Sequence, residues 1–208
     1  MLEQSFEIAK TNWKHNLCTH VVLAVLFCLM APVIMGVKNL EQEQVVKIIE
    51  FYISFLGVVL LIPLFLPDTN RDVRDLIASK KMPITGVRLI RLLQALGMLC
   101  LLLAVFLYAL KCGNCTFDYG KCFYAALANC VAMGGLGLFF YSITDQVVVG
   151  YMIPFIYYIV SIGGGFKYLK VFSLLSFSAG RIEDKKYILT AGVVLILVSL
   201  LAKWKRRA

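Results

Sequence analysis

The chain has 208 residues, of which 61% are hydrophobic and 16% are charged. A soluble globular domain of this length cannot bury so much apolar surface. The composition therefore excludes that class and predicts an all-α polytopic membrane protein with a single transmembrane domain over 1–208. The formal net charge of +9 predicts basic cytoplasmic loops, with the lipid bilayer as a partner and no nucleic-acid binding.

The first sixteen residues combine apolar positions with charges of both signs. Phe6, Ile8 and Ala9 stand among acidic and basic side chains, and Trp13 suits the level of the lipid headgroups. This pattern predicts an N-terminal interfacial helix over 1–16 that lies on the membrane before the first span. A tail without fixed structure is the alternative. No cleavable signal peptide is expected, because the first apolar run is too long for one.

Six apolar runs follow, each close to the roughly 20 residues that a transmembrane helix needs. Six transmembrane helices place both termini on one side. The densest basic clusters lie in the middle loop and the tail, so both termini are expected in the cytoplasm, most simply at a bacterial plasma membrane. Twelve of the 21 Lys and Arg residues are then cytoplasmic. The predicted spans are 17–37, 45–67, 92–110, 122–144, 147–162 and 187–202.

The longest polar interval, Asp68–Arg91, lies between predicted spans two and three and contains six of the 21 Lys and Arg residues. Asp68 and Asn70 are good N-cap residues, and Pro83 ends a helix. The apolar positions between them recur at helical spacing. The pattern predicts a short amphipathic cytoplasmic helix in the region 68–84, with a face for lipid headgroups or for another protein.

Residues 163–186, between predicted spans five and six, are too apolar for a free loop. The expectation is a re-entrant outer hairpin that dips back into the bilayer, and an interfacial helix is an equal alternative. Non-helical backbone at such depth requires shielding by protein or a water-filled cavity. Glycines permit the reversals of direction that this hairpin needs. The expected hinge residues are Gly163, Gly164, Gly165 and Gly180.

Charges inside the predicted spans are few. Glu50 lies in the second run, and an intramembrane charge is a candidate functional residue. Because Lys47 precedes it by three residues, an interfacial ion pair between the two is the favoured interpretation. In the fourth span, Gly134, Gly135 and Gly137 predict close packing of helices.

The seven cysteines include three that flank a short loop placed outside: Cys112, Cys115 and Cys122. A disulfide among these three is expected if the compartment is oxidising, and free thiols are the alternative. The sequence contains no nucleotide-binding loop, no HExxH motif and no nucleophile elbow. No catalytic residue, metal site or cofactor is therefore expected on this chain.

The order of these elements, with the stretch IASKKMPITGVRLIRLLQAL after the second run, resembles the membrane (permease) subunit of type-2, exporter-like ABC transporters. Ser79, Pro83 and Ile84 fit the family's pattern, as does the basic and apolar entry to the third span, Arg88–Leu93. The run Asp72–Asp75 departs from the Glu and Gly-Thr that the family often carries. The resemblance implies a coupling helix that docks on a separate ATPase chain. The implied docking residues are Arg71, Val73, Arg74, Leu76, Ile77, Lys80, Lys81, Met82 and Pro83.

The same resemblance implies a transport subunit and not an enzyme. ATP and Mg would bind the partner ATPase, and a second permease subunit, identical or different, would complete the translocation path. The 163–186 hairpin is similar to the family's re-entrant segment. Two other classes stay open: a substrate-capture subunit of a vitamin-type importer, which would bury a ligand inside one subunit, and a small membrane enzyme. The sequence does not indicate the transported substrate.

Overall fold

The computed structural model describes residues 7, 9–36, 39–69 and 84–205, and within them the chain forms helices and turns with no strand. All nine predicted docking residues, from Arg71 to Pro83, lie outside the described residues. The helices in chain order are η1 (Trp13–Leu17), α2 (Cys18–Met35), α3 (Gln42–Phe51), η2 (Ile53–Phe55), α4 (Leu56–Leu61), η3 (Ile62–Thr69), α6 (Ile84–Cys112), α7 (Tyr119–Thr144), α8 (Val147–Tyr168), η4 (Lys170–Phe172) and α9 (Asp184–Lys205).

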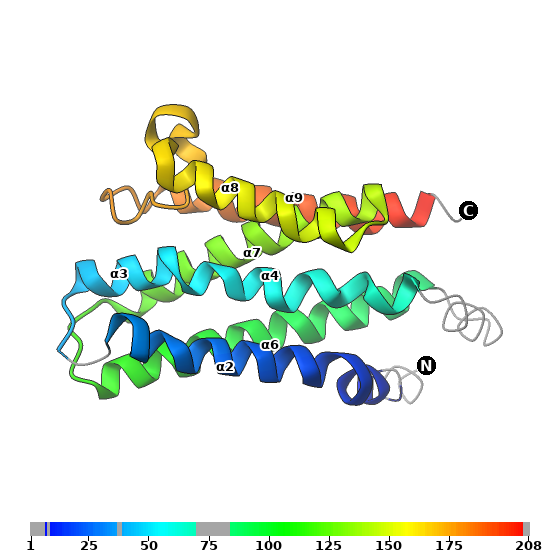
Figure 1. Cartoon of the computed structure of the whole chain (residues 1–208), viewed down its shortest axis with the longest axis horizontal. Coiled ribbons are helices and arrows are strands. Elements are labelled where there is room, and N and C mark those ends of the chain that lie inside the picture. The colour runs from blue at the N-terminus through cyan, green and yellow to red at the C-terminus, as the bar shows by residue number, and fades with distance from the viewer. Residues whose placement is uncertain (1–6, 8, 37–38, 70–83, 206–208) are drawn as a thin grey trace.

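The helices run along the long axis of the molecule, and Figure 1 shows which connections share an end. One end, named the terminal end, holds the turns before α2, the end of η3, the start of α6, the α7–α8 turn and the last turn of α9. The opposite end, named the loop end, holds the α2–α3, α6–α7 and α8–α9 connections. The three connections at the loop end are thus separated from the turns before α2 and from the last turn of α9 by the length of the bundle.

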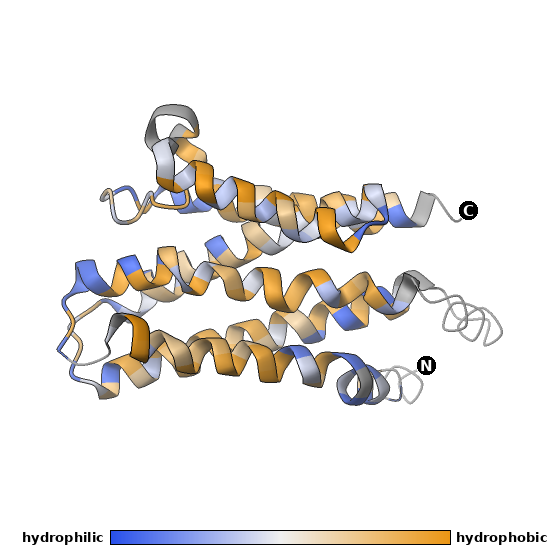
Figure 2. Cartoon of the chain, in the orientation of Figure 1, coloured by the Kyte–Doolittle hydropathy of each residue, from blue (hydrophilic) through white to orange (hydrophobic). Residues whose placement is uncertain are grey.

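Five helices are long and apolar enough to cross a membrane by length and composition, and the chain thereby fits an integral membrane protein. A sixth apolar helix, Cys18–Ile34, is shorter. Figure 2 shows hydrophobic residues along the middle of the bundle and hydrophilic residues towards its two ends. The five long helices are Gln42–Pro67, Gly86–Cys112, Tyr119–Thr144, Val147–Gly164 and Asp184–Lys203, and each overlaps one predicted span.

The helix that precedes α2 is anchored on α6. Residues 9–17 are helical and lead into α2 through the π-helical turn η1, and the first turns bend away from the axis of α2 in Figure 1. Asn12 Nδ2 donates to Gln94 Oε1 at 2.8 Å, and Gln94 Nε2 donates to the carbonyl of Ala9 at 3.0 Å. Trp13, predicted at the headgroup level, is 44% exposed.

α7 is the central helix and packs against α9, α8, α4 and α6. A Cβ at Gly135 would lie 2.6 Å from the carbonyl oxygen of Gly192 on α9, and a Cβ at Gly137 would lie 2.8 Å from that of Gly150 on α8. A Cβ at Gly134 would likewise meet a leucine of α4 at 2.3 Å. These distances confirm the close packing predicted for the three glycines of the fourth span.

Side chains and a left-handed residue define the two ends of α7. The carboxylate of Asp118 caps its first turn by accepting from the N–H of Lys121 at 3.3 Å, and it pairs with Lys121 Nζ at 3.0 Å. The hydrogen bond from the Lys121 side chain lowers the pKa of the Asp118 carboxyl. At the other end, Asp145 has φ of 56° and allows a tight turn into α8.

Candidate functional site

The long helix Gln42–Pro67 departs from α-helical geometry near its middle. α3 ends at Phe51, the 3-10 helix η2 follows at Ile53–Phe55, and α4 begins at Leu56. Where a helix breaks, some carbonyls lose their helical partners. Side chains replace them here: Ser54 Oγ donates to the carbonyl of Glu50 at 2.9 Å, and Tyr158 Oη of α8 donates to that of Phe51 at 2.6 Å. The break is therefore held by groups from within and outside the helix.

The connection between α8 and α9 contains a stretch of turns, residues 173–183, here named the inserted segment. The chain departs from helical geometry at Gly164, where φ is 171° and ψ is 24°. It changes direction again at Gly180, whose φ of 77° lies in the region that favours glycine. The N–H of Arg181 then donates to the carbonyl of Ser176 at 2.8 Å, the longer hydrogen bond of a Schellman turn.

Glu50 lies on α3, is fully buried and accepts three hydrogen bonds. Oε1 accepts from the N–H of Phe177 at 2.9 Å and from Lys185 Nζ at 2.8 Å, and Oε2 accepts from the N–H of Ser178 at 3.1 Å. The predicted ion pair with Lys47 is wrong, because Lys47 is exposed and the partner of Glu50 is Lys185. The carboxylate thus binds backbone amides of the inserted segment as well as a cation.

Lys185 is the second residue of α9 and is also fully buried. Its Nζ donates to three oxygens: Glu50 Oε1 at 2.8 Å, Asn129 Oδ1 at 2.9 Å and the carbonyl of Leu174 at 2.5 Å. These bonds use all three ammonium N–H groups. Asn129 Nδ2 donates in turn to Ser54 Oγ at 3.1 Å and to Leu174 O at 3.2 Å. Glu50, Ser54, Asn129 and Lys185 are here named the polar network.

The polar network lies inside the bundle. Glu50 follows the first residue of α3 by eight positions, and Asn129 follows that of α7 by ten. At 1.5 Å per residue, both side chains originate about 12–15 Å from the tips of their helices at the loop end. Because α9 starts beside them at Asp184, the inserted segment enters the space between α3 and α7. The first part of the segment, with Ser173, Leu174 and Ser176, is buried by protein, whereas residues 178–181 are exposed.

The two charges of the polar network, on Glu50 and Lys185, neutralise each other inside the protein. All four of its side chains are 0% exposed. Burying a charge costs several kcal/mol unless a partner and hydrogen bonds offset the loss of water, and here each charge has both. The network can therefore join helices and hold charge inside the bundle. Among the described residues no cluster of His, Cys, Asp and Glu could hold a metal ion.

A second group of buried polar residues lies at the terminal end. Lys203 of α9 is 3% exposed, forms an ion pair with Asp145 and has its Nζ 5.4 Å from the ring centroid of Tyr141. Arg88 of α6 is 1% exposed, and its guanidinium lies 5.8 Å from the ring centroid of Phe65. Aromatic faces attract cations at such distances. This end therefore carries basic side chains in its interior as well as on its surface.

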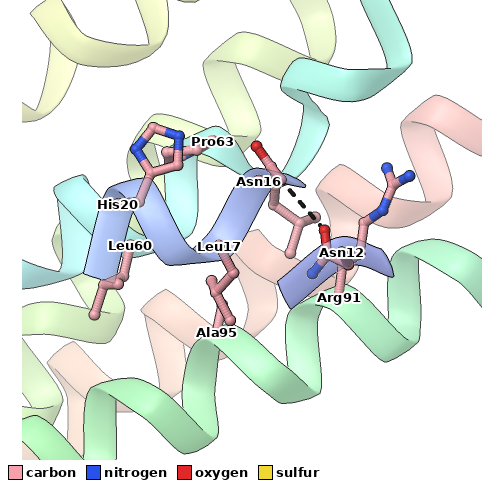
Figure 3. A pocket seen from close by; sticks show the side chains of 9 residues that line it. Asn12, Asn16, Leu17, His20, Leu60, Pro63, Arg91 and Ala95 are labelled. Carbon is pink, nitrogen blue, oxygen red and sulfur yellow. Dashed lines mark hydrogen bonds between the residues drawn. The ribbon is translucent and has the colours of Figure 1, made fainter. Parts of the chain in front are cut away.

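A small pocket opens at the terminal end between the N-terminal helix and α6. Figure 3 shows Asn12 and Asn16 from the N-terminal helix and Arg91 and Ala95 from α6 around it. Its volume of about 10 Å³ is close to that of a single water probe. Small-molecule sites are larger, at roughly 300–1,000 Å³. This pocket therefore has the size of a packing gap and is too small for a drug-sized ligand.

The other predicted site residues have varied surroundings. Cys112, Cys115 and Cys122, the expected disulfide set, are free thiols in the structure, and Cys115 and Cys122 are buried. Of the four expected hinge glycines, Gly164 and Gly180 are the positions at which the backbone leaves helical geometry, as described above. Gly163 and Gly165 lie within the helical run of α8.

Three residues of the polar network were missed from the sequence: Lys185, Asn129 and Ser54. Lys185 is one of the nine Lys and Arg residues that the predicted topology leaves outside the cytoplasm, and the other two stand singly inside apolar runs. Polar side chains within transmembrane helices usually face the bundle interior and hydrogen-bond across helices. A lone amide in the fourth span was therefore the signal that could have found this site.

Comparison of the chain with protein-family models, with curated proteins and with solved structures found no match. The resemblance to exporter-like ABC permeases, carried by residues 79–93, stays a prediction. Function has to follow from the residues and their geometry.

Proposed function

We propose that the chain is the permease subunit of an exporter-like ABC transporter and forms half of its translocation path. The five long apolar helices fit the transmembrane domain of such a subunit. In this proposal the shorter helix Cys18–Ile34 makes a sixth crossing, which places both termini on one side of the membrane, and that side is the cytoplasm. The inserted segment is then the re-entrant part at the outer face.

The observation that carries the proposal is that the two elements on either side of the basic sequence 70–83 meet at the terminal end, where the described chain also begins and ends. The end of η3 and the start of α6, which flank residues 70–83, lie at this end together with the N-terminal turns and the last turn of α9 (Figure 1). Basic residues are enriched on the cytoplasmic side of membrane proteins. This arrangement supports a cytoplasmic face on which a separate ATPase docks. The described Lys and Arg residues toward this end are Lys10, Lys14, Arg88, Arg91, Lys203 and Lys205.

α6 offers a route for force from that face into the bundle. It runs without a break from Ile84 to Cys112, a length of 29 residues. Its first turns are held against neighbours, by the stacking of Arg88 on Phe65 and by the hydrogen bonds of Gln94. A displacement of the chain just before Ile84 would therefore move a rigid helix together with the elements that it contacts.

The proposed coupling helix precedes α6 in the sequence. Its apolar residues Val73, Leu76 and Ile77 fill a groove on the ATPase, and its basic residues meet an acidic rim of that groove. The ATPase binds ATP and Mg and supplies the hydrolysis. Two permease subunits, identical or different, pair around a central path, so that closure of two ATPases drives both coupling helices at once.

The test is association with the ATPase. The tagged chain is purified in mild detergent from its own cells, the bound ATPase is identified by its phosphate-binding loop, and the pair is then reconstituted from purified components. Changing Leu76 and Ile77 together to Asp should weaken binding at least about a hundredfold, because each buried side chain contributes roughly 1.5–3 kcal/mol. Asn114→Asp with Thr116→Asp, two exposed positions at the loop end, is the matched control.

The two variants separate docking from general effects of added charge. We expect the control pair to bind the ATPase as the wild-type chain does and to stimulate its hydrolysis of ATP equally. If the Leu76 and Ile77 variant also binds and stimulates normally, the docking role is refuted. If no ATPase accompanies the wild-type chain, the transport proposal itself fails.

A further inference from the structure

Two interruptions of helical structure meet at the polar network. In the long helix Gln42–Pro67, α-helical geometry ends directly after Glu50 and Phe51 and a 3-10 helix follows. The chain before α9 is non-helical throughout the inserted segment. At the first interruption, the backbone carbonyl of Glu50 accepts a hydrogen bond from Ser54 Oγ. At the second, its carboxylate accepts from the backbone amides of Phe177 and Ser178. One residue therefore connects the two irregular stretches.

We propose that Glu50 is a positioning residue that docks the inserted segment into the bundle, as a latch between α3 and the start of α9. Its carboxylate accepts from the N–H groups of Phe177 and Ser178, at 2.9 and 3.1 Å. Neighbouring amides of the segment instead donate to carbonyls of the segment itself, as Ser176 does to Ser173. The two amides thus depend on a side chain from another element. This inference does not rest on the proposed transport function.

In this latch the hydrogen-bond acceptor must stand at position 50 and the donor at position 185, whereas the charges of an ordinary ion pair can be exchanged. Glu50 supplies acceptors to two backbone donors and to the ammonium of Lys185, while Lys185 supplies donors to three oxygens. A cation at position 50 would place a donor against two donors, whatever charge stood at position 185. Docking therefore requires an acceptor at position 50 and a donor at position 185, and not merely opposite charges.

The latch also defines what moves together. The inserted segment can leave the bundle only when the hydrogen bonds from Phe177 and Ser178 to Glu50 break. Those that Asn129 and Lys185 donate to the carbonyl of Leu174 must break as well. Asn129 ties the same ammonium to α7, and Ser54 ties Asn129 to η2. The loop-end halves of α3 and α7, the start of α9 and the inserted segment therefore form one body.

The experiment is residue-resolved hydrogen exchange on the full chain in lipid nanodiscs. In the wild-type chain the amides of Phe177 and Ser178 should be protected, although they lie in turns. Glu50→Gln should speed their exchange at least about tenfold, because a charge-assisted hydrogen bond is replaced by a neutral one and one acceptor oxygen is lost. Glu43→Gln, on an exposed residue of the same helix, should leave their exchange unchanged.

The swapped variant, Glu50→Lys with Lys185→Glu, separates the latch from a simple ion pair. Its opposite charges should fail to restore protection of the inserted segment, and full restoration would overturn the proposal. Acceleration by Glu50→Gln that is equal at Gly135, in the middle of α7, would show general loosening and would also overturn it. Exchange of the Phe177 and Ser178 amides at the rate of free amides in the wild-type chain overturns the latch without any variant.

Discussion

The contact between α4 and α7 can be tested with a single methyl group. A Cβ at Gly57 would lie 1.8 Å from the carbonyl oxygen of Cys130 and 2.5 Å from its carbonyl carbon. Both are backbone atoms in the middle of α7, so they cannot rotate aside as the tip of a flexible side chain can. Gly57→Ala should therefore force the two helices apart. Gly97 of α6 is the matched control, because nothing lies within 4 Å of a Cβ placed there.

The magnitude follows from the size of the displacement. The distance to the Cys130 oxygen must grow from 1.8 Å to at least 3.0 Å, below which real Cβ contacts are essentially never found. Overpacking of a well-packed core costs about 1–3 kcal/mol, against a gain of about 1 kcal/mol from replacing Gly by Ala in a helix. Because backbone has to move, we expect a net loss of about 2 kcal/mol. Gly97→Ala should instead gain about 0.5–1 kcal/mol.

The assay is unfolding of the purified chain in mild detergent by added dodecyl sulfate, followed by far-ultraviolet circular dichroism. The free energies of unfolding should rank Gly97→Ala at or above the wild-type chain and Gly57→Ala below it. Equal stability of the two variants would refute the close approach of α4 and α7 that the structure shows at Gly57.

Two further stability measurements use the same titration. Lys185→Met should lower the free energy of unfolding by about 3–5 kcal/mol, because it leaves the buried carboxylate of Glu50 without its cation. Lys186→Met, at the exposed neighbouring residue, should leave the free energy of unfolding close to that of the wild-type chain, and equal losses would contradict the pairing. Gly180→Ala should cost about 1–2 kcal/mol, because φ of 77° strains a residue with a Cβ. Gly120→Ala, where a Cβ would meet only ordinary contact, is its control, and indistinguishable variants would argue against the turn at Gly180.

The class of the protein and its five long apolar helices were predictable because hydrophobic length is a local property of the chain. The packing role of Gly134, Gly135 and Gly137 was also predictable, because small residues inside an apolar run usually allow two helices to approach closely. The prediction of six spans is not confirmed, since Cys18–Ile34 is shorter than the other five helices.

The pairings of the polar network could not be predicted from residues that are close in the sequence. Lys47 stands one turn before Glu50 and satisfies the local rule for an ion pair, whereas the true partner lies 135 residues along the chain. No proline or glycine lies between Tyr52 and Phe55, so the sequence gives no signal for the change of helical geometry after Phe51. Pairings that tertiary packing creates cannot be read from neighbouring positions. The docking residues from Arg71 to Pro83 stay a prediction.

The central claim is that this chain is driven by a separate ATPase, and native mass spectrometry of the complex from its own membrane tests it most directly. We predict an assembly in which two permease subunits, one of them this chain, are bound to two copies of an ATPase with a phosphate-binding loop, and the loss of both ATPases when Leu76 and Ile77 are changed to Asp. A chain that leaves the membrane alone, or with partners that contain no such loop, would contradict the claim.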